Sequence, residues 1–272
     1  MIDASPQAPD LPPVIGHRGA AAAAPENTLA SLRKAKELGA TWVEFDVKLT
    51  RDGHPVLFHD DRLDRTTSGQ GEVALTTLAQ LRKLDAGAWF APAFEGERVP
   101  SFADALALCA ELGLGINVEL KPCPGREAET ARVALETLLE HWPERRPAPL
   151  ISSFARVCLR VACEVAPGLP RGYLAGALPR RWREQLEAYR CATLHLHHRR
   201  VSARQRAAVA AAGVPLALYT VNDPLRARAL LGTGATALFT DRVGEVLTAL
   251  DAGAEASGLS SGASGRRDAP AP

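Results

Sequence analysis

The amino-acid sequence predicts a (β/α)8 TIM barrel, and three observations support this fold class. The chain has 272 residues, of which 46% are hydrophobic and 23% charged, so it can bury one sizeable core. Short apolar or β-branched runs alternate along it with longer segments of helical apolar spacing. Eight such strand–helix pairs can be counted over about 250 residues, the usual length of this barrel. A doubly wound open sheet is the main alternative.

The expected strands are short runs rich in apolar and β-branched residues. In chain order they are Val14–His17, Trp42–Lys48, Ile116–Leu120, Leu150–Ser153, Gly172–Leu174, Thr193–Leu196, Leu216–Val221 and Ala237–Thr240. The expected helices repeat apolar residues at helical spacing. They are Asn27–Leu38, Ser101–Leu112, Arg126–His141, Ala155–Val165, Pro179–Ala188, Ala203–Ala212, Pro224–Leu231 and Val243–Ala252.

Two segments depart from this alternation. After the second strand, a turn at Asp52-Gly53 leads to an extended run, Val56–His59, and then to about forty residues where a single helix should stand. This segment, about residues 60–100, is too long for a βα loop and too apolar for a linker, so we expect a small insertion over one mouth of the barrel. Residues 253–272 are rich in Gly, Ser, Ala and Pro and are expected to be disordered. Residues 1–252 are therefore expected to form a single domain.

Charge and hydropathy exclude several classes of partner. The chain carries 32 Lys and Arg against 31 Asp and Glu, so no large field of one sign exists to hold nucleic acid or an anionic membrane. No run approaches the ~18 apolar residues of a membrane span. The N-terminal residues lack the basic and apolar regions of an export signal, and the five cysteines form no CxxC pair. We therefore expect a cytoplasmic protein with reduced thiols that acts on a small molecule. The oligomeric state is left open.

Carboxylates gather on the inward faces of the second and third strands. The strand period of two places Val43, Phe45 and Val47 of this second strand on one face and Glu44 and Asp46 on the other. The same alternation turns Glu119 inward from Ile116–Leu120. Converging carboxylates are costly unless a cation neutralises them. A set of oxygen donors without thiolate suits a hard cation such as Mg²⁺ or Ca²⁺.

Imidazole and guanidinium groups lie at the same strand ends, where barrels collect reactive groups. His17 and Arg18 end the first strand, and His59 ends the extended run after the second. Each group has an ordinary structural explanation. Glu119 could form an ion pair with Lys121, Glu44 and Asp46 could pair with Lys48 and Arg51, His17 could be a buried core residue, and Asn27 could simply cap a helix. The combination of all these groups on the rims of three strands favours a functional site.

The sequence resembles the glycerophosphodiester phosphodiesterase family, from about Val14 to Leu250. The motifs that carry the resemblance are His17-Arg18-Gly19, Pro25-Glu26-Asn27-Thr28, Glu44-x-Asp46, Asp52-Gly53, His59-Asp60, Arg65-Thr66-Thr67, Leu84-Asp85-Ala86-Gly87-x-Trp89-Phe90, Asn117-x-Glu119-x-Lys121, Ser152-Ser153-Phe154, Tyr219-Thr220-Val221-Asn222 and Thr240-Asp241. In detail the chain looks most like the cytoplasmic bacterial branch.

The resemblance implies metal-dependent hydrolysis of glycerophosphodiesters, the deacylated phospholipid head groups, to sn-glycerol 3-phosphate and an alcohol. It implies that His17 and His59 act as general acid and base. It also implies that Glu44, Asp46 and Glu119 hold the divalent metal, Mg²⁺ or Ca²⁺. The nucleophile is left open between water and the glycerol's own neighbouring hydroxyl.

The resemblance also implies the substrate-binding residues. Arg18 and Lys121 are expected to hold the phosphate, with Glu26 near the first histidine, and Phe154 and Tyr219 are expected to line the pocket. Many members carry Trp where Tyr219 stands.

His197 is a second departure from the family pattern, since Asn is expected at that position. Two descriptions of His197 are left open: a residue in the wall of the site, or a solvated loop histidine. The alternatives from other classes are a phosphate-binding barrel without turnover and a hydrolase of membrane phospholipids. Head-group preference is left open.

Overall fold

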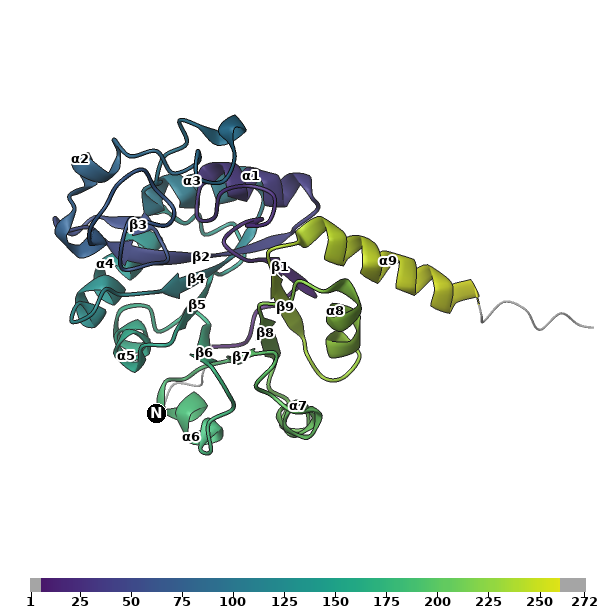
Figure 1. Ribbon diagram of the computed structural model, residues 1–272. Helices are drawn as coiled ribbons and strands as arrows, with labels where there is room; N and C mark the ends of the chain where they lie inside the picture. Colours follow the sequence, from purple (N-terminus) through teal and green to yellow (C-terminus); the bar gives the residue numbers. More distant parts are fainter. Residues whose placement is uncertain (1–5, 260–272) are drawn as a thin grey trace, which may run out of the picture.

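The computed structural model describes residues 6–259 and forms a closed parallel barrel (Figure 1). The sheet order is β1-β9-β8-β7-β6-β5-β4-β2-β3, and a further pairing of β1 with β2 closes the barrel. All neighbours are parallel except β3, which pairs with β2 antiparallel. The strands are β1 Val14–Gly16, β2 Trp42–Leu49, β3 Pro55–Leu57, β4 Gly115–Leu120, β5 Leu150–Ser153, β6 Arg171–Ala175, β7 Thr193–His197, β8 Leu216–Tyr219 and β9 Ala237–Thr240.

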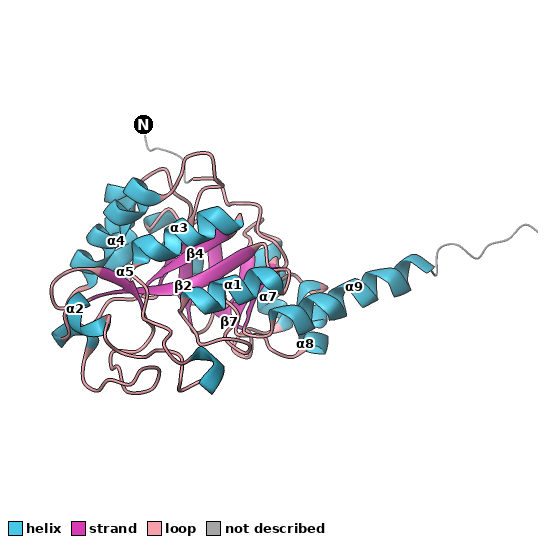
Figure 2. Cartoon of the chain, turned by 90° about the horizontal axis from the view of Figure 1, so that it is seen from above, coloured by secondary structure: helices cyan, strands magenta, loops and turns pink. Residues whose placement is uncertain are grey.

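Helices surround the strands on the outside of the barrel (Figure 2). The α-helices are α1 Leu29–Glu37, α2 Leu78–Leu81, α3 Phe102–Leu112, α4 Glu127–His141, α5 Arg156–Val165, α6 Trp182–Ala188, α7 Ala203–Ala210, α8 Pro224–Leu231 and α9 Val243–Leu259. The predicted (β/α)8 barrel is therefore confirmed, with β3 and α2 belonging to the segment after the second barrel strand. In the described part of the chain, no helix is long and apolar enough to cross a membrane.

The first helix begins later than expected, and the reason lies in the site. Thr28, not Asn27, is the N-cap of α1, because its side chain accepts a hydrogen bond from the backbone N–H of Ser31. Asn27 precedes the cap with φ 57° and turns its side chain toward Asp46. The alternative in which Asn27 simply caps this helix is therefore wrong.

The last helix ends later than expected. It continues to Leu259 rather than stopping at Ala252 and extends away from the barrel (Figure 1). The expectation of a disordered tail concerns residues 253–272, of which residues 260–272 lie outside the described residues.

The barrel interior is apolar at one end only. Leu11, Ile15, Trp42, Leu150 and Ala217 pack together inside it, and Trp42 and Leu150 each begin a strand. This hydrophobic cluster fills the amino-terminal end of the barrel. The carboxylates of β2 and β4 face inward beyond this cluster, toward the carboxyl ends of the strands, where barrel enzymes place their sites.

The inserted segment between β2 and α3 has a small core of its own. That core contains Val56, Phe58, Leu63, Val73, Leu81, Ala86 and Val99, and Cys123, which follows β4, packs into it. The segment is joined to the barrel by an ion pair of 2.7 Å between the buried Lys48 and Asp61. The backbone N–H of Phe58 also donates to the carbonyl of Asp46. These contacts hold His59 against the carboxyl end of β2.

Candidate active site

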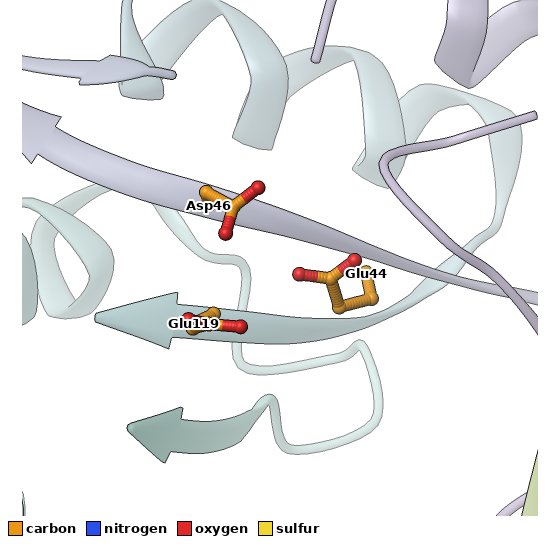
Figure 3. Close-up of side chains that lie close together, drawn as sticks. All are labelled: Glu44, Asp46 and Glu119. Carbon is orange, nitrogen blue, oxygen red and sulfur yellow. The ribbon is translucent and has the colours of Figure 1, made fainter. Parts of the chain in front are cut away.

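Three carboxylates converge inside the barrel at the carboxyl ends of β2 and β4. Glu44 and Asp46 come from β2 and Glu119 from β4, and Asp46 lies directly across from Glu119 in the strand register. Figure 3 shows the three side chains turned toward one another. One oxygen atom from each lies within 4.8 Å of the others, and all three residues are at most 8% exposed. The inward orientation predicted from strand alternation is therefore confirmed.

The three carboxylates differ in their electrostatic environments. Burial raises the pKa of Glu119 to about 7, and the neighbouring Asp46 adds to the effect. Burial, with Asp46 and Glu119 beside it, raises the pKa of Glu44 well above its ordinary value. Burial acts in the same direction on Asp46, but Lys121 and Arg18 outweigh it and hold that pKa below its ordinary value. Asp46 is therefore the anion that this cluster retains most firmly.

The cluster fits a hard divalent cation. Its donor atoms are all carboxylate oxygens, the ligands that Mg²⁺ and Ca²⁺ prefer. Glu44 Oε1 is buried without a hydrogen-bond partner among the described residues. A buried carboxylate oxygen left in this way is costly, and a cation would satisfy it. Lys121 alone does not complete the neutralisation, because its Nζ contacts Asp46 at 3.2 Å and Glu119 at 3.1 Å but no contact joins it to Glu44.

His17 follows β1 and is oriented by a carboxylate from the far end of the chain. Its Nδ1 lies 2.6 Å from Asp241 Oδ1, and Asn222 Nδ2 donates to the other oxygen of that carboxylate at 2.6 Å. His17 Nε2 lies 3.9 Å from Glu44 Oε2. The Nδ1 contact fixes the ring and directs Nε2 toward the carboxylate cluster.

His59 follows β3 and is held in the same way. Its Nδ1 lies 2.6 Å from Asp60 Oδ1, and Arg65 donates to both oxygens of Asp60. Burial lowers the pKa of His59, with a smaller opposing effect from Asp46. Both imidazoles are thus anchored through Nδ1 to a carboxylate, which leaves Nε2 as the nitrogen available for proton transfer.

Arg18 and Lys121 are the cations beside the cluster. Arg18 Nη1 donates to Glu26 Oε1 at 2.7 Å, and its Nε lies 3.4 Å from Asp46. Lys121 Nζ lies 5.9 Å from the centre of the Phe154 ring. Burial lowers the pKa of each cation, but Asp46 and its neighbours outweigh burial and raise both pKa values. Both side chains therefore stay charged.

Glu26 lies in an arginine network rather than against a histidine. Its carboxylate accepts from Arg18 and, through both oxygens, from Arg65. Because Arg65 also holds Asp60, this network joins the residues around β1 to the residue that orients His59. Glu26 was expected near the first histidine, and its hydrogen-bond partners in the structure are Arg18 and Arg65.

Aromatic side chains form one wall of the cavity above the carboxylates. Phe154 and Tyr219 lie edge to face with ring centres 6.0 Å apart, and Phe154 is 51% exposed. Tyr219 donates its hydroxyl to the Ala175 carbonyl, and burial raises the pKa of Tyr219 to about 12. His197 lies at the end of β7, with its ring 5.7 Å from Tyr219. The cavity has a volume of about 280 Å³ and is lined by His17, Glu44, Asn117, Glu119, Ser152, Phe154, Leu174, His195, Tyr219 and Phe239.

The structure decides between the alternatives left by the sequence. Lys48 pairs with Asp61, so it does not neutralise Glu44 or Asp46. The expected pair of Glu119 with Lys121 exists, but it belongs to the carboxylate cluster instead of standing apart from it.

Sequence reasoning gave no catalytic, metal-binding or substrate-binding role to the residues that orient the site. These are Asn27, Asp60, Arg65, Asn222 and Asp241. Asp241 directly follows β9 and Asn222 lies shortly after β8. The rule that collects polar residues at strand ends could therefore have found these two.

Comparison with known protein families shows a match over most of the chain. The sequence pattern of the glycerophosphoryl diester phosphodiesterase family matches residues 17–245, a range that contains every site residue described above. The chain belongs to this family of phosphoric diester hydrolases. The predicted resemblance is confirmed at that level.

Two curated relatives illustrate the likeness. A putative glycerophosphodiester phosphodiesterase of Bacillus subtilis is 33% identical over 84% of this chain and 93% of its own length. The glycerophosphodiester phosphodiesterase of Caldanaerobacter subterraneus is 41% identical over 59% of this chain, and the match spans 65% of that relative, just under two thirds of its length.

A solved structure is similar over almost its entire length. The phosphodiesterase of Oleispira antarctica in complex with the product sn-glycerol-3-phosphate has a TM-score of 0.87 and 43% identity, covering 89% of this chain and 97% of that one. A putative glycerophosphoryl diester phosphodiesterase from Silicibacter pomeroyi has a TM-score of 0.78 and 26% identity.

Proposed function

We propose that this protein hydrolyses glycerophosphodiesters to sn-glycerol 3-phosphate and an alcohol. The observation that carries the proposal is a cluster of three converging carboxylates with two imidazoles beside it, each anchored by its own carboxylate. A cluster with a purely structural role would need neither of the two anchored imidazoles. The product bound to the Oleispira antarctica relative, which is 43% identical, supports the same substrate class.

The anionic diester requires positive charge at its oxygens before it can react. Arg18 and Lys121 supply it, because both lie at the cluster and both stay charged. In the free protein they are occupied by Asp46, Glu26 and Glu119. We infer that a bound phosphate replaces these carboxylates in some of their contacts with Arg18 and Lys121.

Glu44, Asp46 and Glu119 would hold a divalent cation, either Mg²⁺ or Ca²⁺. Such a cation supplies Lewis-acid charge neutralisation at a phosphoryl oxygen. Asn27 supports this role from the protein side, since its amide donates to Asp46 Oδ2 at 2.9 Å and accepts from the Asp46 backbone N–H. These contacts hold the Asp46 carboxylate in one orientation.

His17 and His59 move the protons. One imidazole accepts a proton from the attacking hydroxyl while the other donates a proton to the departing alcohol. Asp241 orients the ring of His17, and Asp60 that of His59, because each carboxylate lies 2.6 Å from Nδ1. We favour the glycerol's own neighbouring hydroxyl as the attacking group over water, because a tethered nucleophile can reach effective molarities of ~10⁵ M or more.

The remaining parts of the assignment follow from the same family. Phe154 and Tyr219 form the wall against which the substrate lies, with His197 behind Tyr219. The catalytic domain comprises residues 1–252, including the insertion at about 60–100. We place the protein in the cytoplasmic bacterial branch, acting on a small diffusible diester without nucleic acid or membrane insertion.

A coupled assay for released sn-glycerol 3-phosphate tests the proposal. Glycerophosphocholine should be turned over with added Mg²⁺ or Ca²⁺ and should not be turned over in EDTA after dialysis. Lysophosphatidylcholine should be a much poorer substrate. Asp46→Asn should fold normally and be inactive, whereas the exposed His54→Ala should match the wild type. Absence of turnover across several glycerophosphodiesters would instead indicate a binding barrel without activity.

A further inference from the structure

The cavity of the proposed active site has a polar floor that the proposed chemistry does not use. The floor comprises Asn117 from β4, Ser152 from β5 and His195 from β7. All three side chains are at most 1% exposed. They line the same cavity as Glu44 and Glu119, so the floor is continuous with the carboxylate cluster.

Two atoms of this floor are buried without a hydrogen-bond partner among the described residues. Asn117 Nδ2 donates to Ser152 Oγ at 3.0 Å, which leaves Asn117 Oδ1 unpaired. His195 Nε2 lies 2.9 Å from Thr193 Oγ1, which leaves His195 Nδ1 unpaired. Buried polar atoms are paired in nearly all native structures, so two orphans in one cavity indicate a missing polar group.

The floor is suited to a neutral group. Burial lowers the pKa of His195 to about 3, so its imidazole is uncharged. With the Thr193 hydroxyl donating to Nε2, the proton of the ring lies on Nδ1, which is then an unpaired donor of a residue that lines the cavity. Asn117 Oδ1 is an unpaired acceptor of another residue that lines this cavity. One donor and one acceptor together match a single hydroxyl group, which accepts one hydrogen bond and donates another.

We propose that Asn117 and His195 bind the terminal hydroxyl of the substrate's glycerol unit. This inference rests on the proposed function and adds how the glycerol end is recognised. The phosphate is held at Arg18 and Lys121, so the hydroxyl furthest from phosphorus is the one that reaches the floor. The head-group alcohol stays at the opposite, open end of the cavity, where Phe154 is half exposed.

Binding to the full-length chain tests the floor independently of turnover. Isothermal titration in Mg²⁺ compares sn-glycerol 3-phosphate with 2-hydroxypropyl phosphate, in which a methyl group replaces the terminal CH₂OH. The wild type should bind the first about 10-fold or more tightly, because the analogue leaves both floor atoms unpaired. In Asn117→Leu and His195→Phe the two ligands should bind within about threefold of each other.

A matched control separates recognition from the general effect of altering a buried polar residue. Thr130 on α4 is also fully buried with an unpaired Oγ1, but it does not line the cavity. Thr130→Val should keep the wild-type ratio. His195→Gln retains a hydrogen-bond donor and should therefore restore part of the affinity ratio. This second variant keeps the test valid if His195→Phe fails to fold.

Equal affinity of the wild type for both ligands would overturn the inference, since the floor would then hold only water. Loss of the ratio in Thr130→Val as well would also overturn it. If the ratio is present but glycerophosphocholine is not hydrolysed, the proposed function fails while the floor assignment stands.

Discussion

Glu119→Gln should make the metal-free protein more stable, although Glu119 lies in the centre of the site. Its pKa is raised from the ordinary 4.5 to about 7, first by burial and then by Asp46. At about 1.4 kcal/mol per pKa unit, ionising this carboxylate in the folded protein costs about 3 kcal/mol. Gln removes the charge and keeps an oxygen that can accept from Lys121, as Glu119 Oε1 does now.

The sign of this effect depends on pH. A carboxyl with a raised folded pKa contributes stability that is fully present below its unfolded pKa and is lost as pH rises through the folded value. The wild type should therefore lose stability between pH 5 and pH 8.5, whereas Glu119→Gln should lack this part of the loss. The gap between the two proteins should widen by about 2–3 kcal/mol, or about 5–10 °C in melting temperature.

Thermal and urea denaturation in EDTA at both pH values measure the gap. Added Mg²⁺ or Ca²⁺ should reverse the order at pH 8.5, because a cation at about 1,000 times its Kd stabilises the wild type by about 4.1 kcal/mol and the variant lacks one ligand. The reasoning would be refuted by a wild type at least as stable as the variant in EDTA at pH 8.5. A gap that is the same at both pH values would also refute it.

Three other predictions concern the reaction. His17→Ala and His59→Ala should each lower kcat by ~10²–10⁴-fold without additive loss in the double variant, while His54→Ala keeps its activity; near-normal turnover in either single variant would exclude its role. Arg65→Gln should lower kcat about 10-fold or more, because Asp60 loses the donor that orients it; an unchanged pH–rate profile and kcat would show that Arg65 only anchors the insertion. A diester without the hydroxyl neighbouring its ester oxygen should bind competitively and react at about 1% of the normal rate or less. Hydrolysis at the normal rate would mean that water is the nucleophile.

Much of the site was predictable because local sequence patterns determine which side chains of a strand face inward. The alternation along Trp42–Leu49 turns every second residue inward, which places Glu44 and Asp46 in the barrel without knowledge of the neighbours. The rule that strand carboxyl ends share one mouth then brings Glu119 and His17 to the same place. The barrel itself follows from the repeated strand–helix alternation, which is also a local signal.

Tertiary structure decided the partners of these residues. Asp241 meets His17 only because β1 pairs with β9 and closes the barrel, and no local pattern reports that pairing. The turn of Asn27 away from the helix it precedes depends on Asp46 being within reach.

Burial likewise depends on the assembled barrel. The two unpaired atoms of the floor, on Asn117 and His195, exist because strands far apart in sequence enclose them. By itself the sequence therefore determined which residues face inward, since strand geometry acts over neighbouring residues. Which groups meet, which remain unpaired and how far the pKa of Glu119 rises were decided by barrel closure, because hydrogen bonds and desolvation act over a few ångströms between segments distant in the chain.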